Sequence, residues 1–111
     1  MTKPRNNLGD FQQLVLLALL RLRDNAYGMT VRRELAERTG RQVSLGAVYT
    51  TLDRLEARGY VSSWIGEATP ERGNRRKKYF RVEAAGEAAL RQSQQVTARM
   101  LDGLQPVGGA L

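Results

Sequence analysis

The chain has 111 residues, which is enough for one domain. Its formal net charge is +7, because it contains 18 lysine and arginine residues and 11 aspartate and glutamate residues. Cysteine and histidine are absent, which excludes disulfides, thiolate chemistry, and the commonest general base and transition-metal ligand. The longest apolar run, Leu14 to Leu20, is too short to cross a bilayer, and the N-terminus has no hydrophobic signal region, so we expect a cytoplasmic protein without membrane contact.

The residue types that remain for catalysis show no paired-carboxylate, Ser-x-x-Lys, P-loop or dinucleotide-binding pattern. We therefore expect the protein not to be an enzyme and to hold no metal or cofactor. A strongly basic domain of this size most often binds a polyanion, although the charge alone could also serve solubility.

A helix is predicted over residues 11–23, capped by Asp10 and preceded by a short basic arm, residues 1–7, that we expect to be flexible. Apolar side chains cover nearly its whole circumference, which is not typical of a helix on the surface of a monomer. One face is expected to enter the core and the other to contact a second copy of the chain; a fully central core helix is the alternative. The residues expected to contact the second copy are Phe11, Leu16, Leu19 and Leu20.

The segment from Asp24 to Gly28 is rich in turn-forming residues. A second helix is predicted from about Met29 to Thr39, and Gly40 ends it. Its outward arginine and glutamate residues are typical of a solvated, salt-bridged face. A short connection leads into the next helix, and two helices joined in this way form the helix-turn-helix arrangement.

Ser44 is expected to cap a third helix, which Gly59 closes. Apolar residues from Leu45 to Leu55 recur at helical spacing and form one buried stripe, while the opposite face is small, then hydroxylated, then basic. Such a face suits the major groove of DNA, although an ordinary solvated surface helix is the alternative. The residues of this helix expected to contact DNA are Ser44, Gly46, Ala47, Tyr49, Thr50 and Arg54.

Two strands, Tyr60 to Ile65 and Tyr79 to Val82, are predicted to form a hairpin, which we call the wing. Its loop concentrates basic residues, which repel one another unless an anion is bound; a solvated loop is the alternative. A hairpin beside a recognition helix can straddle the DNA backbone and reach the minor groove. Trp64 is expected to pack at the edge of the core, with stacking on a flat ligand as the alternative. The wing residues expected to contact DNA are Arg72, Asn74, Arg75, Arg76 and Lys77.

The last helix is predicted over residues 83–104, and residues 105–111 are expected to be frayed. Its second half repeats apolar and polar residues at alternating spacings of four and three, which is a heptad seam. This seam is too short and too polar to be stable alone, so we expect it to dock on the first helix of a second copy; folding back onto its own domain is the alternative. Its dimerisation residues are Leu90, Gln94, Thr97, Leu101 and Leu104.

Three stretches of this chain resemble the PadR family of bacterial transcriptional regulators: LGDFQQLVLLALLRLRDNAYG, SLGAVYTTLDRLEARGYVSS and TPERGNRRKKYFRVEAAGEAAL. The resemblance implies a mainly α fold with a small β-hairpin (α+β). It implies a winged helix-turn-helix DNA-binding domain over residues 8–82 and a dimerisation helix over residues 83–104. It further implies a homodimer that represses genes by binding an inverted repeat in double-stranded DNA.

Two residues depart from the family pattern. Asn74 stands where a second wing glycine is usual, and Glu83 stands where a threonine often caps the last helix. Some family members respond to small aromatic or cationic compounds, but this sequence contains no recognisable effector site. The alternative to a DNA-binding regulator is a winged-helix module that binds another protein and has no specific DNA site.

Overall fold

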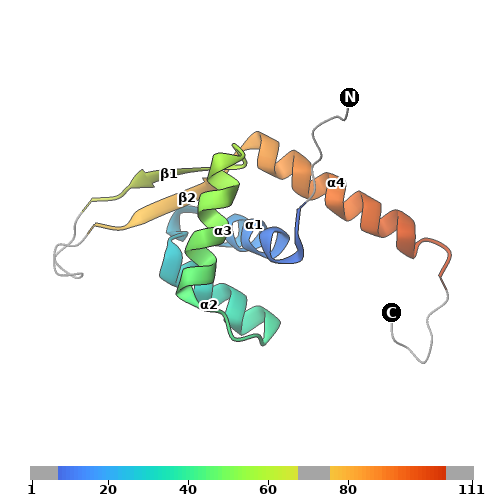
Figure 1. Ribbon diagram of the computed structural model, residues 1–111, viewed down its shortest axis with the longest axis horizontal. Helices are drawn as coiled ribbons and strands as arrows, with labels where there is room; N and C mark the ends of the chain where they lie inside the picture. Colours follow the sequence, from blue (N-terminus) through green and yellow to red (C-terminus); the bar gives the residue numbers. More distant parts are fainter. Residues whose placement is uncertain (1–7, 68–75, 105–111) are drawn as a thin grey trace.

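The computed structural model describes residues 8–67 and 76–104, which form helices packed around one core and a projecting β-hairpin (Figure 1). A short 3-10 turn, Arg23–Asn25, follows the first helix. The elements are α1 (Asp10–Leu22), α2 (Gly28–Thr39), α3 (Leu45–Ala57), β1 (Val61–Ile65), β2 (Lys78–Val82) and α4 (Ala84–Leu101). This order confirms the predicted mainly α class with a small hairpin.

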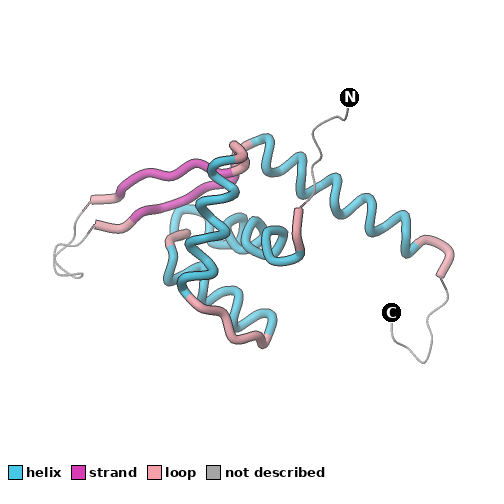
Figure 2. Tube along the Cα trace, in the orientation of Figure 1, coloured by secondary structure: helices cyan, strands magenta, loops and turns pink. Residues whose placement is uncertain are grey.

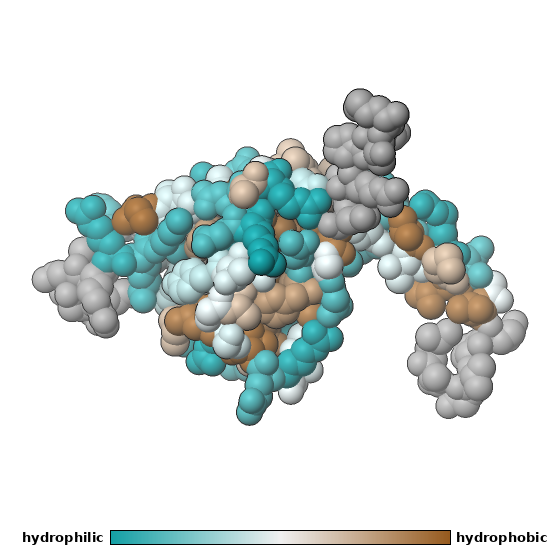
Figure 3. Space-filling model, in the orientation of Figure 1, coloured by the Kyte–Doolittle hydropathy of each residue, from teal (hydrophilic) through white to brown (hydrophobic). Residues whose placement is uncertain are grey.

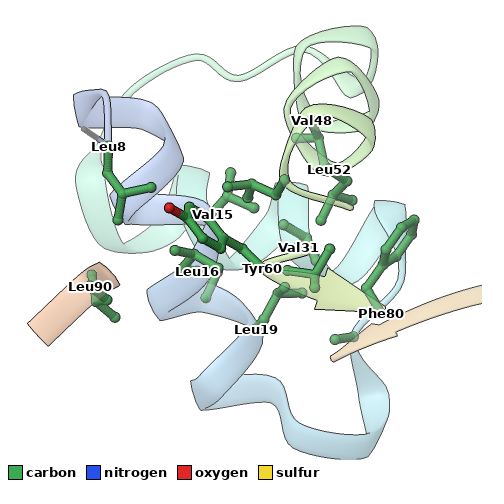
Figure 4. Packing of buried hydrophobic residues seen from close by; sticks show 14 of the residues in the cluster. Leu8, Val15, Leu16, Leu19, Val31, Val48, Leu52, Tyr60, Phe80 and Leu90 are labelled. Carbon is green, nitrogen blue, oxygen red and sulfur yellow. The ribbon is translucent and has the colours of Figure 1, made fainter. Parts of the chain in front are cut away.

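One cluster of buried apolar side chains joins the first three helices to the hairpin (Figure 4). Val15 of α1, Val31 of α2, Leu52 of α3 and Phe80 of β2 have no exposed surface. Removing a side chain of this size from water stabilises the fold by about 1.5–3 kcal/mol. The wing is therefore anchored through Phe80 to the same core that holds the helices.

The face of α1 that was predicted from the sequence to contact a second copy of the chain is only partly exposed. Leu16 and Leu19 are 0% and 2% exposed, because α2, α3, α4 and β2 surround α1 on several sides. Leu90, on α4, is 5% exposed and belongs to the same core. The expectation that these three leucines contact a second copy is corrected, because they have almost no surface to offer. Leu20 is 39% exposed and Phe11 is half-buried.

The start of α1 differs from the prediction as well. The cap is Gly9, whose backbone N–H donates to Gln12 Oε1 at 3.1 Å. Asp10 lies in the first turn instead, where a carboxylate is favoured by the helix dipole, and pairs with Arg41 Nη1 at 3.1 Å.

A charged cluster links the surfaces of α1 and α2. Glu34 Oε2 accepts hydrogen bonds from Arg21 Nε at 2.8 Å and from Arg38 Nε at 2.7 Å. These bonds favour the ionised carboxylate and hold the pKa of Glu34 below its usual value. The salt-bridged outer face predicted for α2 is present at this residue.

The two strands lie side by side as a hairpin (Figure 2). They pair antiparallel, with Ser63 opposite Phe80 and Trp64 opposite Tyr79. Since side chains alternate along a strand, the hairpin has two different faces. Phe80 and Val61 on one face enter the core, while Trp64 and Tyr79 lie on the other face. Tyr27 forms an isolated bridge with Tyr79 and so extends the sheet by one residue beside β2.

The beginning of α4 packs on the body, and the rest projects from it, on the side opposite the hairpin (Figure 1). A Cβ atom at Gly86 would overlap the carbonyl oxygen of Tyr60, so α4 approaches the backbone closely there. Past Leu90 the helix is mostly exposed, including Val96 at 44% and Met100 at 74%. None of the helices in residues 8–67 and 76–104 has the length and apolar character needed to span a membrane.

We predict that Gly86→Ala destabilises the protein by about 1–3 kcal/mol, because the new methyl group must displace backbone rather than a flexible side chain. Gly46→Ala is the matched control, since no atom lies within 4 Å of a Cβ built there; alanine should leave stability equal or raise it by up to about 1 kcal/mol. Urea unfolding measures both. Equal midpoints for Gly86→Ala and the unmodified protein would contradict the close approach.

Candidate nucleic-acid interface

The ends of α3 are fixed by local hydrogen bonds that were foreseeable from the sequence. Ser44 Oγ accepts from the Ala47 backbone N–H at 3.1 Å, which confirms the predicted N-cap. At the other end Gly59 has φ 77°, a left-handed conformation that suits glycine. The N–H of Gly59 donates to Glu56 O and that of Tyr60 to Leu55 O, both at 2.9 Å, which is a Schellman motif.

The inner stripe of α3 is fully buried, and this fixes the direction of its outer face. Val48, Leu52 and Leu55 have no exposed surface. The six residues predicted to contact DNA from this helix are all exposed, and the helical geometry gathers them on the outer side. They are Ser44, Gly46, Ala47, Tyr49, Thr50 and Arg54.

The N-terminal half of α3 is open to solvent at Gly46 and is packed against α2 at Tyr49. A Cβ at Gly46 would lie in open space, so nothing inside the chain requires a glycine there. Tyr49 is 39% exposed, and a Cβ at Gly28 would overlap its hydroxyl, so its ring lies against the first residue of α2. This contact ties the N-terminus of α2 to the edge of the α3 outer face.

The wing is joined to α3 through Glu56. The Ser63 hydroxyl donates to Glu56 Oε2 at 2.7 Å, and Lys78 Nζ lies 4.0 Å from Glu56 Oε1. These contacts place one face of the hairpin on the same side of the molecule as α3. Lys78 is exposed there, although the sequence-based set of contacts omitted it because it was assigned to the end of the basic run.

The five wing residues that were predicted to contact DNA differ in their exposure, and only two of them lie within the described residues. Arg76 is exposed next to the start of β2. Lys77 is half-buried, with its Nζ 4.4 Å above the ring of Tyr27, so its charge is held against that ring. The other three predicted contacts lie outside the described residues; they are Arg72, Asn74 and Arg75.

Trp64 lies on the hairpin face that points away from α3. Its ring stacks on Tyr79, with centroids 5.6 Å apart and planes 18° apart, and the Arg81 guanidinium lies 5.1 Å from its centre. This favours the packing role over a free stacking surface. A hollow of about 230 Å³ between Trp64 and the end of α1 includes Leu20 and Arg81 in its lining, and it is separate from the α3 face.

Asp53 is an exposed, charged residue on this face that the sequence-based contact set did not include. It is the acidic side chain among the exposed residues of α3, and Ala57 follows it one turn later on the same side. Helical spacing from Gly46 places it there, but the predicted contacts comprise only small, hydroxylated, aromatic and basic residues. Within residues 8–67 and 76–104, no group of three or more acidic side chains is arranged to hold a metal ion.

Comparison with known sequences identifies one family. The sequence model of the transcriptional regulator PadR-like family matches residues 16–92, which is more than half of the chain and includes α2, α3 and the hairpin. Among curated proteins, no sequence relative matches.

Several solved structures share the fold. A PadR family transcriptional regulator from Eggerthella lenta is 30% identical, with a TM-score of 0.66 over 82% of this chain and 77% of that chain. A PadR family transcription regulator from Clostridium difficile is 20% identical, with a TM-score of 0.65 over 83% of this chain and 95% of that chain. Bordetella bronchiseptica BpsR, whose DNA binding is regulated by 6-hydroxynicotinic acid, is 22% identical, with a TM-score of 0.62 over 95% of this chain and 74% of that chain. These matches confirm the predicted winged-helix architecture.

We predict that Ser44→Ala lowers stability by about 1 kcal/mol, because the Ala47 N–H loses the side-chain acceptor that caps α3. Ser44→Asn should restore most of the loss, since asparagine also caps helices well. Urea unfolding of the three proteins measures the effect. Identical midpoints for all three would show that the cap hydrogen bond contributes nothing to the stability of the protein.

Proposed function

Since the chain belongs to the PadR-like family of transcriptional regulators, we propose that it is a repressor that binds an inverted repeat in double-stranded DNA as a homodimer. Members of this family are transcription factors rather than enzymes. The observation that carries the proposal is the common orientation of two surfaces. The open, polar outer face of α3 and the exposed Lys78 of the wing lie on one side, joined through Glu56.

In this proposal the outer face of α3 enters the major groove. Gly46 and Ala47 let the helix approach the base edges, because they add little or no side chain. Thr50 and Arg54 follow on the same side and supply a hydroxyl and a guanidinium, groups that bond bases or phosphates. Tyr49 directs its hydroxyl toward the N-terminus of α2, which suits a contact to the backbone at the edge of the groove.

The wing supplies the electrostatic part of the proposed affinity. Arg76 and Lys78 are exposed at the beginning of β2 and just before it, and we propose that they contact phosphates. We assign the same phosphate contacts to Arg72, Asn74 and Arg75. Lys77 is expected to contribute less to the affinity for DNA, because its ammonium lies over the ring of Tyr27. Basic groups on phosphates release counterions, so affinity should fall steeply as salt rises.

The proposed dimer interface uses the part of α4 that follows Leu90, which is mostly exposed. Apolar side chains gather near the C-terminal end of this helix, as Figure 3 shows, and Met100, Leu101 and Leu104 are 74%, 46% and 57% exposed. Such a group on a helix that projects from the body is typical of an interface. Leu20 of α1 offers a further exposed apolar group that a second copy could cover. A twofold dimer would present two α3 helices about 34 Å apart, one turn of DNA.

The contrast between the packed body and the exposed last helix also supports the domain boundaries expected from the sequence. Residues 8–82 contain the core, α3 and the wing, and we propose that they form the DNA-binding part. Residues 83–104 begin with the Gly86 contact to the body and continue as the exposed helix, which we propose as the dimerisation part.

We predict that the protein selects an inverted repeat from random duplexes. Arg76→Ala should weaken binding to all duplexes by a similar factor. Because a dimer loses two such contacts, the slope of log affinity against log salt should become shallower by about 2. Thr50→Ala should instead change the base preference at one position of each half-site. Selection followed by gel shift at several salt concentrations measures both effects.

The matched control is Arg99→Ala, which removes the same charge from the side of α4 opposite its seam. It should leave affinity and preference unchanged. Equal retention of every duplex by the unmodified protein at moderate salt would contradict specific regulation, and stoichiometric capture of a protein partner without any DNA footprint would favour the protein-interaction alternative.

We further predict a dimer mass in solution, measured by light scattering after size exclusion. Leu101→Asp should convert the dimer into monomer by placing a charge in the apolar seam of α4, whereas Gln95→Asp, on the other side of the helix, should not. A monomer mass for the unmodified protein at micromolar concentration would overturn the proposed dimer.

A further inference from the structure

The outer face of α3 contains a carboxylate that the proposed DNA contacts leave without a role. Asp53 is exposed, and positions 46, 50, 53 and 57 follow one another at spacings of four, three and four residues. At 3.6 residues per turn these positions lie on one side of the helix. Asp53 therefore points in the same direction as Gly46 and Thr50, toward the proposed DNA.

Within residues 8–67 and 76–104, no ion pair neutralises this charge. The helical neighbours of Asp53 at three and four positions are Tyr49, Thr50, Glu56 and Ala57, none of which is basic. Asp53 thus differs from the carboxylates that hold the fold together, such as Glu34 between α1 and α2.

A carboxylate on a surface that contacts DNA must avoid phosphates, because like charges repel. An ionised carboxylate only accepts hydrogen bonds. In the major groove guanine presents two acceptors and thymine presents an acceptor and a methyl group, so neither base offers it a donor. Adenine has an N6 amine, but its N7 acceptor lies beside the amine and faces the second carboxylate oxygen. Cytosine presents its N4 amine with no acceptor on the same base, although the O6 of the paired guanine lies beside it.

We propose that Asp53 is a specificity-determining residue that accepts a hydrogen bond from the N4 amine of one cytosine in each half-site. This inference rests on the proposed entry of α3 into the major groove. It deepens that proposal, since it assigns a base and an atom to a residue that no basic-patch argument would select. Arg54, its neighbour in the sequence, is then free to contact guanine or the backbone.

The test is selection from random duplexes with the unmodified protein, Asp53→Ala and Asp53→Asn. The unmodified protein should select cytosine at one position of each half-site. Asp53→Ala should lower that preference by about 5-fold to 150-fold, the range for one specific base contact, and leave the other positions unchanged. Asp53→Asn should shift the preference toward adenine, because an amide both donates to N7 and accepts from N6.

Glu87→Gln is the matched control. It removes one carboxylate from an exposed residue in the first turn of α4 and should leave the selected sequence unchanged. The inference is overturned if Asp53→Ala binds all duplexes more tightly by one common factor with an unchanged base preference, since the carboxylate would then act only by repulsion. It is also overturned if neither Asp53 variant changes the preference. Both results leave the proposed function standing, whereas failure of the unmodified protein to select any site would remove the proposed function itself.

Discussion

The burial of the inner stripe of α3 against α1, α2 and the hairpin is the constraint on which the other features depend. Val48, Leu52 and Leu55 have no exposed surface, and Phe80 of the wing shares their core. Because a helix that buries one stripe must expose the opposite one, the same contacts that stabilise the fold set the direction of the outer face. The stability of the core and the orientation of the proposed DNA-contacting face are therefore one physical property.

The geometry of the wing relative to α3 has a more local cause. Glu56 accepts a hydrogen bond from the hydroxyl of Ser63 and lies near the ammonium of Lys78, so one side chain links α3 to both strands. On the far face, Tyr27 and Trp64 contact the ring of Tyr79 and support the hairpin from behind. The wing is thus held on both faces before any partner is present, which reduces the ordering cost of binding.

The parts of the fold that follow from local chemistry could be predicted from the sequence. Ser44 and Gly59 bound α3 as expected, since cap preferences depend on a few neighbouring backbone groups. The leucines of α1 and α4 could not be assigned in the same way: Leu16 is apolar in either setting, and its periodicity does not distinguish the core of one chain from an interface between two. The packing of Tyr49 on Gly28 depends on a tertiary contact between two helices. Asp53 is acidic, and a basic or small residue pattern does not indicate an acidic contact to DNA.

The central claim, that the outer face of α3 lies in the major groove of a duplex, can be tested directly because the chain contains no cysteine. A single thiol introduced by Ala57→Cys, at an exposed position on that face, can carry an iron chelate that cuts nearby DNA. On the selected inverted repeat we expect cuts at two positions about one helical turn apart, and none from the same reagent at Arg99→Cys on α4. Dispersed cutting from Ala57→Cys, or equal cutting from both positions, would contradict this account.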